Sequence, residues 1–134
     1  MEIQHLPHLL QSPLTAISIK IVSLLGRKYL LVPDRAKIRS VLTKDIVRLE
    51  GIKNYTILHL RNGDTMFSSR TLKVYDEILQ QSNFLRIHKA HLINMKCFRN
   101  YDKSQHQYTV MQSRDVINIS RRKRKNFQER TTVK

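Results

Sequence analysis

The sequence is divided into many short apolar runs, with turn-forming residues between one run and the next. Residues 55–60 alternate between two faces, and Asn62-Gly63-Asp64, a typical hairpin turn, follows them. Short runs bounded in this way are typical of strands, and Pro33-Asp34 is expected to end the first of them. The predicted strands are 29–32, 38–42, 46–50, 55–60, 65–67, 84–87, 90–93, 97–101, 107–111 and 116–119.

One internal segment has a helical period. Within 69–81, the apolar residues Leu72, Tyr75, Ile78 and Leu79 recur at spacings of three and four, which predicts an amphipathic helix. Ser69 and Thr71 are candidate N-caps for it. The basic stretch 120–130 has helix propensity, and Ser120 is its candidate cap. The pattern therefore predicts a mostly β domain with one internal helix and a basic C-terminal helix or turn.

Charge indicates the kind of partner. The chain has 25 Lys and Arg against 10 Asp and Glu, a net charge of +15. Such an excess favours a polyanion, either nucleic acid or an anionic membrane. The single cysteine, Cys97, excludes an internal disulfide framework and a four-cysteine zinc module, and we expect it in the core.

The N-terminal segment 1–26 differs in composition from the rest, with one acid and one lysine. Its apolar stretch 13–25 is interrupted by Lys20 and is shorter than the ~20 residues of a spanning helix. No basic flank precedes it and no cleavage site follows it, which argues against a signal or anchor. We therefore expect an arm at 1–26 for docking or dimerisation, a folded domain at 27–130 and a tail at 131–134.

Four stretches, in order, resemble the motifs of LytTR-type DNA-binding domains, and the resemblance covers about 29–130. They are D-I-V-R-L-E-G-I-K-N-Y (45–55), T-L-K-V-Y-D-E-I-L (71–79), F-L-R-I-H-K-A-H-L-I-N (84–94) and N-I-S-R-R-K-R-K-N-F (118–127). The third is the most specific, and Ala90 stands where the family commonly has Ser.

This resemblance implies a bacterial transcription regulator domain made of short antiparallel sheets that lie side by side. Such domains read double-stranded DNA through loops placed in successive major grooves rather than through a recognition helix, and they often bend paired direct repeats. The 26 residues before the domain leave no room for a phosphoacceptor receiver domain, so we expect no phosphorylation control in cis.

The resemblance also suggests the residues that contact DNA. The family position of Arg122 contacts DNA directly, that of Lys89 lies on a DNA-facing loop, and Lys53 and Asn54 lie at its first contacting loop. An arginine can bind guanine with two hydrogen bonds, whereas lysine mostly meets phosphate. The predicted DNA-binding residues are Lys53, Asn54, Arg86, His88, Lys89, Arg121, Arg122, Lys123 and Lys125.

Each assignment has a structural alternative. Arg86 can pair with an internal acid, Asn54 can hold a turn, and the basic run 121–125 can be a solvated tail. We expect Tyr55 to be a packing residue.

No metal, cofactor or catalytic site is expected. His88 and His91 have a metal-like spacing, but residues three apart in an extended segment face opposite sides. The carboxylates are scattered and pair with no histidine or serine in a way that suggests acid–base catalysis. The protein is therefore not expected to be an enzyme.

The leading hypothesis is a cytoplasmic, sequence-specific regulator that binds double-stranded DNA at paired direct repeats, with a homodimer or another protein contacted through 1–26. The alternative is a basic protein-interaction or membrane-proximal module with nonspecific nucleic-acid affinity. The interrupted apolar stretch argues against the membrane.

Overall fold

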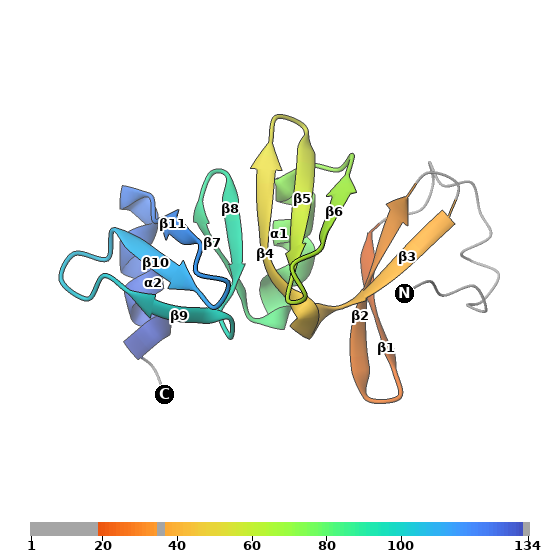
Figure 1. Cartoon of the computed structure of the whole chain (residues 1–134), viewed down its shortest axis with the longest axis horizontal. Coiled ribbons are helices and arrows are strands. Elements are labelled where there is room, and N and C mark those ends of the chain that lie inside the picture. Colours follow the sequence, from red (N-terminus) through yellow and green to blue (C-terminus); the bar gives the residue numbers. More distant parts are fainter. Residues whose placement is uncertain (1–18, 35–36, 133–134) are drawn as a thin grey trace. The chain divides into compact units, whose positions relative to one another are not determined.

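The computed structural model describes residues 19–34 and 37–132 (Figure 1). The chain divides into two compact units, with the boundary between Asp45 and Ile46. Each unit is built on antiparallel strands, which confirms the mostly β fold.

The first unit contains a three-stranded sheet in the order β1-β2-β3. Its strands are β1 (Lys20–Leu24), β2 (Arg27–Asp34) and β3 (Lys37–Leu42), and a 3₁₀ turn, η3 (Thr43–Asp45), follows. The residues 29–32 are all buried, as expected for a central strand. The prediction that Pro33 ends this strand is wrong, because Pro33 remains in register with Ile38 of β3. Proline lacks only the amide donor, and its φ suits an extended chain.

Strand β1 lies inside the segment expected to be an arm, and residues 1–18 of that arm lie outside the described residues. The expected arm boundary at residue 26 falls in the turn between β1 and β2. Residues 133–134 of the expected tail are also outside the described part. The proposed division at 26 and 130 therefore stays a prediction.

The second unit is centred on a five-stranded sheet in the order β6-β5-β4-β8-β7. Its strands are β4 (Ile46–Ile52), β5 (Tyr55–Leu60), β6 (Thr65–Ser68), β7 (Phe84–His88) and β8 (His91–Asn94). The pairing of β4 with β8 joins the three-stranded meander β4-β5-β6 to the β7-β8 hairpin, which lies further along the sequence. This non-consecutive pairing decides which turns share an end of the sheet.

Helix α1 (Leu72–Leu79) connects β6 to β7 and packs on one face of the sheet, with η4 (Gln80–Ser82) extending it. The buried residues Leu72, Tyr75 and Leu79 form its inner side, which confirms the predicted helix within shorter bounds. Thr71 is the N-cap residue, but its side chain makes no capping hydrogen bond. The Tyr75 hydroxyl donates to Ser68 Oγ (2.5 Å), and burial raises the pKa of Tyr75 to about 12.

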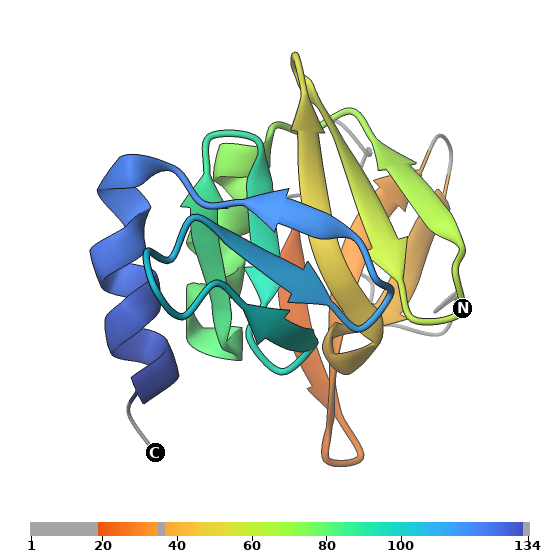
Figure 2. The same cartoon turned by 60° about the vertical axis from the view of Figure 1, so that its left-hand side comes forward.

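A three-stranded sheet covers part of the opposite face (Figure 2). It has the order β11-β10-β9, with β9 (Phe98–Tyr101), β10 (Tyr108–Met111) and β11 (Val116–Asn118). Helix α2 (Arg124–Thr132), preceded by η5 (Arg121–Lys123), adds one buried side chain, Phe127. The shared core consists of Val47, Leu85, Ile87, Ile93, Cys97, Met111, Ile117, Ile119 and Phe127.

The core position of Cys97 and the basic C-terminal helix confirm two predictions. Ser120 is the N-cap residue of η5, at the start of this helical segment, but its side chain makes no capping hydrogen bond. Its backbone N–H instead donates to the Ile87 carbonyl (2.8 Å), which attaches the segment to β7.

Candidate nucleic-acid interface

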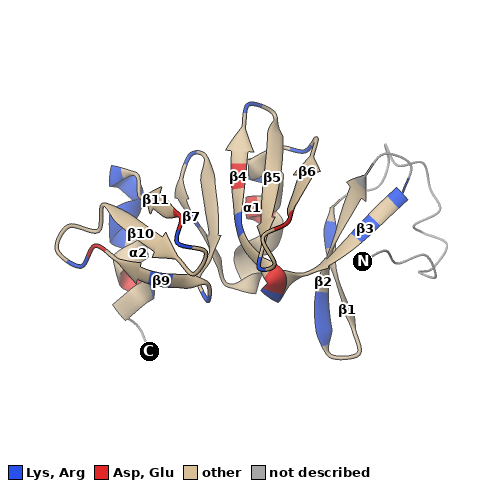
Figure 3. Cartoon of the chain, in the orientation of Figure 1, with Lys and Arg blue, Asp and Glu red and all other residues tan. Residues whose placement is uncertain are grey.

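Two basic turns lie at one end of the five-stranded sheet. Lys53 and Asn54 form the turn between β4 and β5, and Lys89 and Ala90 form the turn between β7 and β8. Glu50 is paired with His91 across β4 and β8, and the Gly51 N–H donates to the Ala90 carbonyl (2.9 Å). The antiparallel register therefore places both turns at the same end, as Figure 3 shows from the Lys and Arg colouring.

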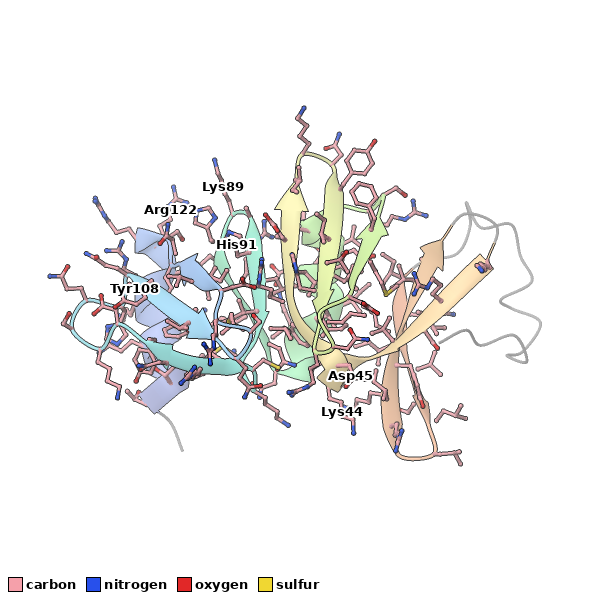
Figure 4. The ribbon with its side chains drawn as sticks, viewed as in Figure 1. Lys44, Asp45, Lys89, His91, Tyr108 and Arg122 are labelled. Atoms are coloured by element: carbon pink, nitrogen blue, oxygen red, sulfur yellow. The ribbon has the colours of Figure 1, made fainter. Side chains whose placement is uncertain are left out.

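The third basic element reaches this end through its attachment to β7. The Ser120 bond to Ile87 places η5 next to the β7–β8 turn. An open cleft of about 500 Å³ lies between them. It is lined by Asp76, Arg86, His88, Lys89, Ser120, Arg121, Arg122 and Lys123. Figure 4 shows Lys89 and Arg122 projecting from the same side of the unit.

Six of the nine predicted site residues thus line one cleft, and the other three lie outside it. Lys53 and Asn54 are exposed in the neighbouring turn, and Lys125 is exposed on α2. The left-handed turn position is held by Lys53 (φ 55°) rather than by Asn54. The left-handed conformation costs a residue with a Cβ about 1–2 kcal/mol. The turn therefore carries its exposed lysine at a strained backbone position.

Arg86 makes the internal ion pair that was the alternative to DNA contact. Its Nη1 lies 3.6 Å from Asp76 Oδ2 of α1. Its Nε donates to the His88 carbonyl (3.1 Å), and its Nη2 donates to the Lys89 carbonyl (2.5 Å). The Arg86 side chain is only 22% exposed, and its guanidinium faces the turn backbone.

The expectation that His88 and His91 face opposite sides is wrong. The chain reverses at Lys89 and Ala90, so the two histidines form a cross-strand pair with ring centroids 5.2 Å apart. The Ala90 N–H donates to His88 Nδ1 (3.0 Å), which places the ring proton of neutral His88 on Nε2. Burial, then the charge of Arg48, lowers the pKa of His91. The described residues contain no group of three or more His, Cys, Asp or Glu that could hold a metal ion.

Sequence reasoning did not identify Asp76 as a cleft residue. Its position beside Tyr75, on the inner side of α1, was the available signal, because a carboxylate there needs a partner. The histidine–carboxylate contact of His59 Nε2 with Glu50 Oε1 (3.0 Å) was also missed. Arg48, which is 8% exposed, makes ion pairs with two carboxylates. Its Nη1 lies 3.6 Å from Glu50 Oε1, and its Nε lies 3.3 Å from Asp115 Oδ2. This network neutralises a buried arginine on the sheet face.

Tyr55, expected to be a packing residue, packs only at the surface. It is 44% exposed and its ring lies 5.0 Å from that of Phe67, which is 61% exposed. Both belong to the strands beside the Lys53–Asn54 turn.

Exposed basic turns gathered at one end of an antiparallel sheet are typical of a nucleic-acid-binding domain. The family model described as LytTr DNA-binding domain matches residues 36–132, and the chain belongs to this family. The family is one of DNA-binding domains and not of enzymes, and it gives the chain a role in transcription regulation.

The fold agrees with a solved relative, the LytTr DNA-binding domain of a putative methyl-accepting/DNA response regulator from Bacillus cereus. The two are 14% identical, with a TM-score of 0.65, over 78% of this chain and 97% of that chain. No curated protein shows significant sequence similarity to the chain. Within the described residues, no helix has both the length and the apolar character needed to cross a membrane.

Proposed function

We propose that the protein is a sequence-specific regulator that reads double-stranded DNA through its turns, in successive major grooves. The observation that carries the proposal is the gathering of the Lys53–Asn54 turn, the Lys89–Ala90 turn and η5 at one end of the second unit. Short projecting turns can enter a groove without a helix, and side chains at their tips then reach the base edges.

Capture and reading belong to different side chains. The net charge of +15 attracts the duplex and releases its counterions, which gives affinity without sequence preference. Arg121, Lys123 and Lys125 are assigned to phosphates. Arg122 is assigned to a guanine, because a guanidinium can donate to its O6 and N7 together.

The two hairpin turns complete the reading surface. Asn54 is assigned to an adenine, whose N6 and N7 match a carboxamide, and Lys53 to a nearby phosphate. Lys89 is assigned to a base or phosphate next to the cleft. The Nε2–H of His88 is a donor suited to a phosphate oxygen.

Binding at paired direct repeats, dimerisation through 1–26 and a cytoplasmic location form the rest of the proposal. They are supported by the family resemblance and by the apolar composition of 1–26. Most of that segment lies outside the described residues. A monomeric elution at micromolar concentration, unchanged when 1–26 is deleted, would contradict the dimer.

Selection of bound sequences from a random duplex pool tests the function, at about 0.15 M salt to screen nonspecific attraction. We expect enrichment of one motif, repeated at a fixed spacing. Tight, salt-sensitive binding without enrichment would instead indicate a basic architectural protein. Absence of binding would refute the DNA-binding role of the isolated chain.

A further inference from the structure

We propose that Asp76 and Arg86 are positioning residues, which hold the β7–β8 turn in the shape that presents Lys89 to DNA. This inference rests on the proposed function. It assigns a role to a carboxylate on α1, a helix that otherwise serves the core.

The contacts of Arg86 span the whole turn. The planar guanidinium donates to two successive carbonyls, those of His88 (3.1 Å) and Lys89 (2.5 Å), while its Nη1 faces Asp76 at 3.6 Å. Only arginine has several donors in a fixed planar fork, whereas a lysine ammonium would meet these acceptors as a single point charge. The same turn is closed from inside by the bond from the Ala90 N–H to His88 Nδ1.

Asp76 supplies a rigid anchor for this fork. It is adjacent to Tyr75, which is fully buried, and the Asp76 side chain itself is 22% exposed. Alternation along β7 turns Leu85 and Ile87 into the core shared with the three-stranded sheet, so Arg86 projects toward the α1 side. The turn is thus connected to the packed helix through one ion pair.

The sign of the Asp76 charge argues for a positioning role. Every other charged residue that lines the cleft is basic, and a carboxylate there repels phosphate. If the cleft needed only to attract DNA, Asp76 would reduce its affinity. Its contact with Arg86 gives the carboxylate a different role, because it orients the fork that binds the Lys89 carbonyl.

The two roles make opposite predictions for Asp76→Asn. Removing a negative charge strengthens binding to any duplex, whereas loosening the turn weakens binding to the selected motif alone. We expect the ratio of affinities for the motif and an unrelated duplex to fall by about fivefold, the lower end of what one base contact provides. Glu77→Gln is the matched control, since it removes one exposed carboxylate from the same helix. It should leave the ratio unchanged.

The variant Arg86→Lys tests the planar geometry of the guanidinium separately from its charge. It retains the positive charge but cannot bridge both carbonyls, so its affinity ratio should fall as far as that of Arg86→Gln. If Arg86 only contacted phosphate, the lysine variant would keep the ratio of the wild type. In a Lys89→Ala background, Asp76→Asn should give no further loss, because the pair acts through Lys89.

Amide hydrogen exchange of the free protein decides the positioning role without DNA. Asp76→Asn and Arg86→Lys should accelerate exchange at Ala90 by about tenfold relative to the wild type, while Glu77→Gln should not change it. Unchanged exchange at Ala90, or equal gains for motif and unrelated duplex in Asp76→Asn and Glu77→Gln, would overturn the inference. If no motif is enriched but the exchange accelerates, the proposed function fails and the structural support of the turn stands.

Discussion

Replacing Phe127 by alanine tests whether a single side chain fixes the C-terminal part of the interface. Phe127 is fully buried and is the buried residue of α2. Its ring lies 5.8 Å from that of Phe98 and 5.4 Å from that of Tyr101, in edge-on or tilted contact. Because α2 directly follows the basic residues of η5, loss of this anchor should release Arg122 as well as the helix.

The expected loss of unfolding free energy depends on the burial of Phe127 and on how far the structure around it can relax. Truncating a buried phenylalanine to alanine costs about 3–5 kcal/mol. Here the loss cannot exceed the free energy that docks α2, since the helix can detach instead of leaving an empty cavity. We therefore expect about 3 kcal/mol, near the low end of that range. Phe127→Leu keeps most of the apolar volume and should cost less than about 1.5 kcal/mol.

Urea denaturation of both variants, followed by circular dichroism, measures this difference. Amide exchange should show α2 opening in Phe127→Ala while the strands of the five-stranded sheet stay protected. Binding to the selected duplex should weaken more in the alanine variant than in the leucine variant. A loss of stability below about 1 kcal/mol, or unchanged specificity with α2 open, would refute the reasoning.

Three further predictions concern reading, packing and pH. Arg122→Ala should lower the specificity for the selected motif by about 1–3 kcal/mol in competition binding. Lys125→Ala should weaken binding to all duplexes alike, and the slope of log K against log salt concentration should fall by about 1. Equal losses of specific and nonspecific binding in both variants would contradict this division of roles. Gly51→Ala should lower the free energy of unfolding, measured in urea, by about 1–2 kcal/mol, because a Cβ there would lie 3.2 Å from Leu72 Cβ. This overpacking outweighs the smaller entropic gain of alanine. A stabilised variant would show that α1 shifts to make room for the added methyl group. His91, whose folded pKa is lowered from 6.5, mainly by burial, binds its proton more weakly in the folded state. The contribution of neutral His91 to stability is therefore present above pH about 6.5 and is lost as the pH falls through the pKa of His91 in the folded state. The urea midpoint of His91→Gln should depend less on pH than that of the wild type.

Most of the fold could be predicted because its signals are local. Alternating residues 55–60 and the Asn62-Gly63 turn specify one hairpin, and the spacing of Leu72, Tyr75 and Leu79 specifies the helix. Strand β1 was missed, because its pairing with β2 depends on a partner rather than on its own pattern.

The sequence predicted which residues belong to the candidate interface but not how they are arranged in space. The basic turns could be identified from charge and from the family motifs, whereas their meeting at one end depends on the pairing of β4 with β8. No local pattern specifies that pairing. The Lys89–Ala90 reversal contains neither glycine nor asparagine, so the residues between His88 and His91 do not include the usual signal of a tight hairpin turn. The ion pair of Asp76 with Arg86 likewise joins a helix to a strand through tertiary packing.

The exposure of the turn tips has an evolutionary consequence. The side chains of Lys53, Asn54 and Lys89 are exposed, while the strands behind them contribute buried residues such as Leu49 and Ile87. Mutations at the tips remove little buried apolar surface, so selection for stability restrains them less than it restrains the strands. A lineage could acquire a new operator by drift at a few tip positions, on an inherited scaffold. Divergence between paralogues should then concentrate at positions 53, 54 and 89, which makes these the positions to exchange when a regulator is redirected.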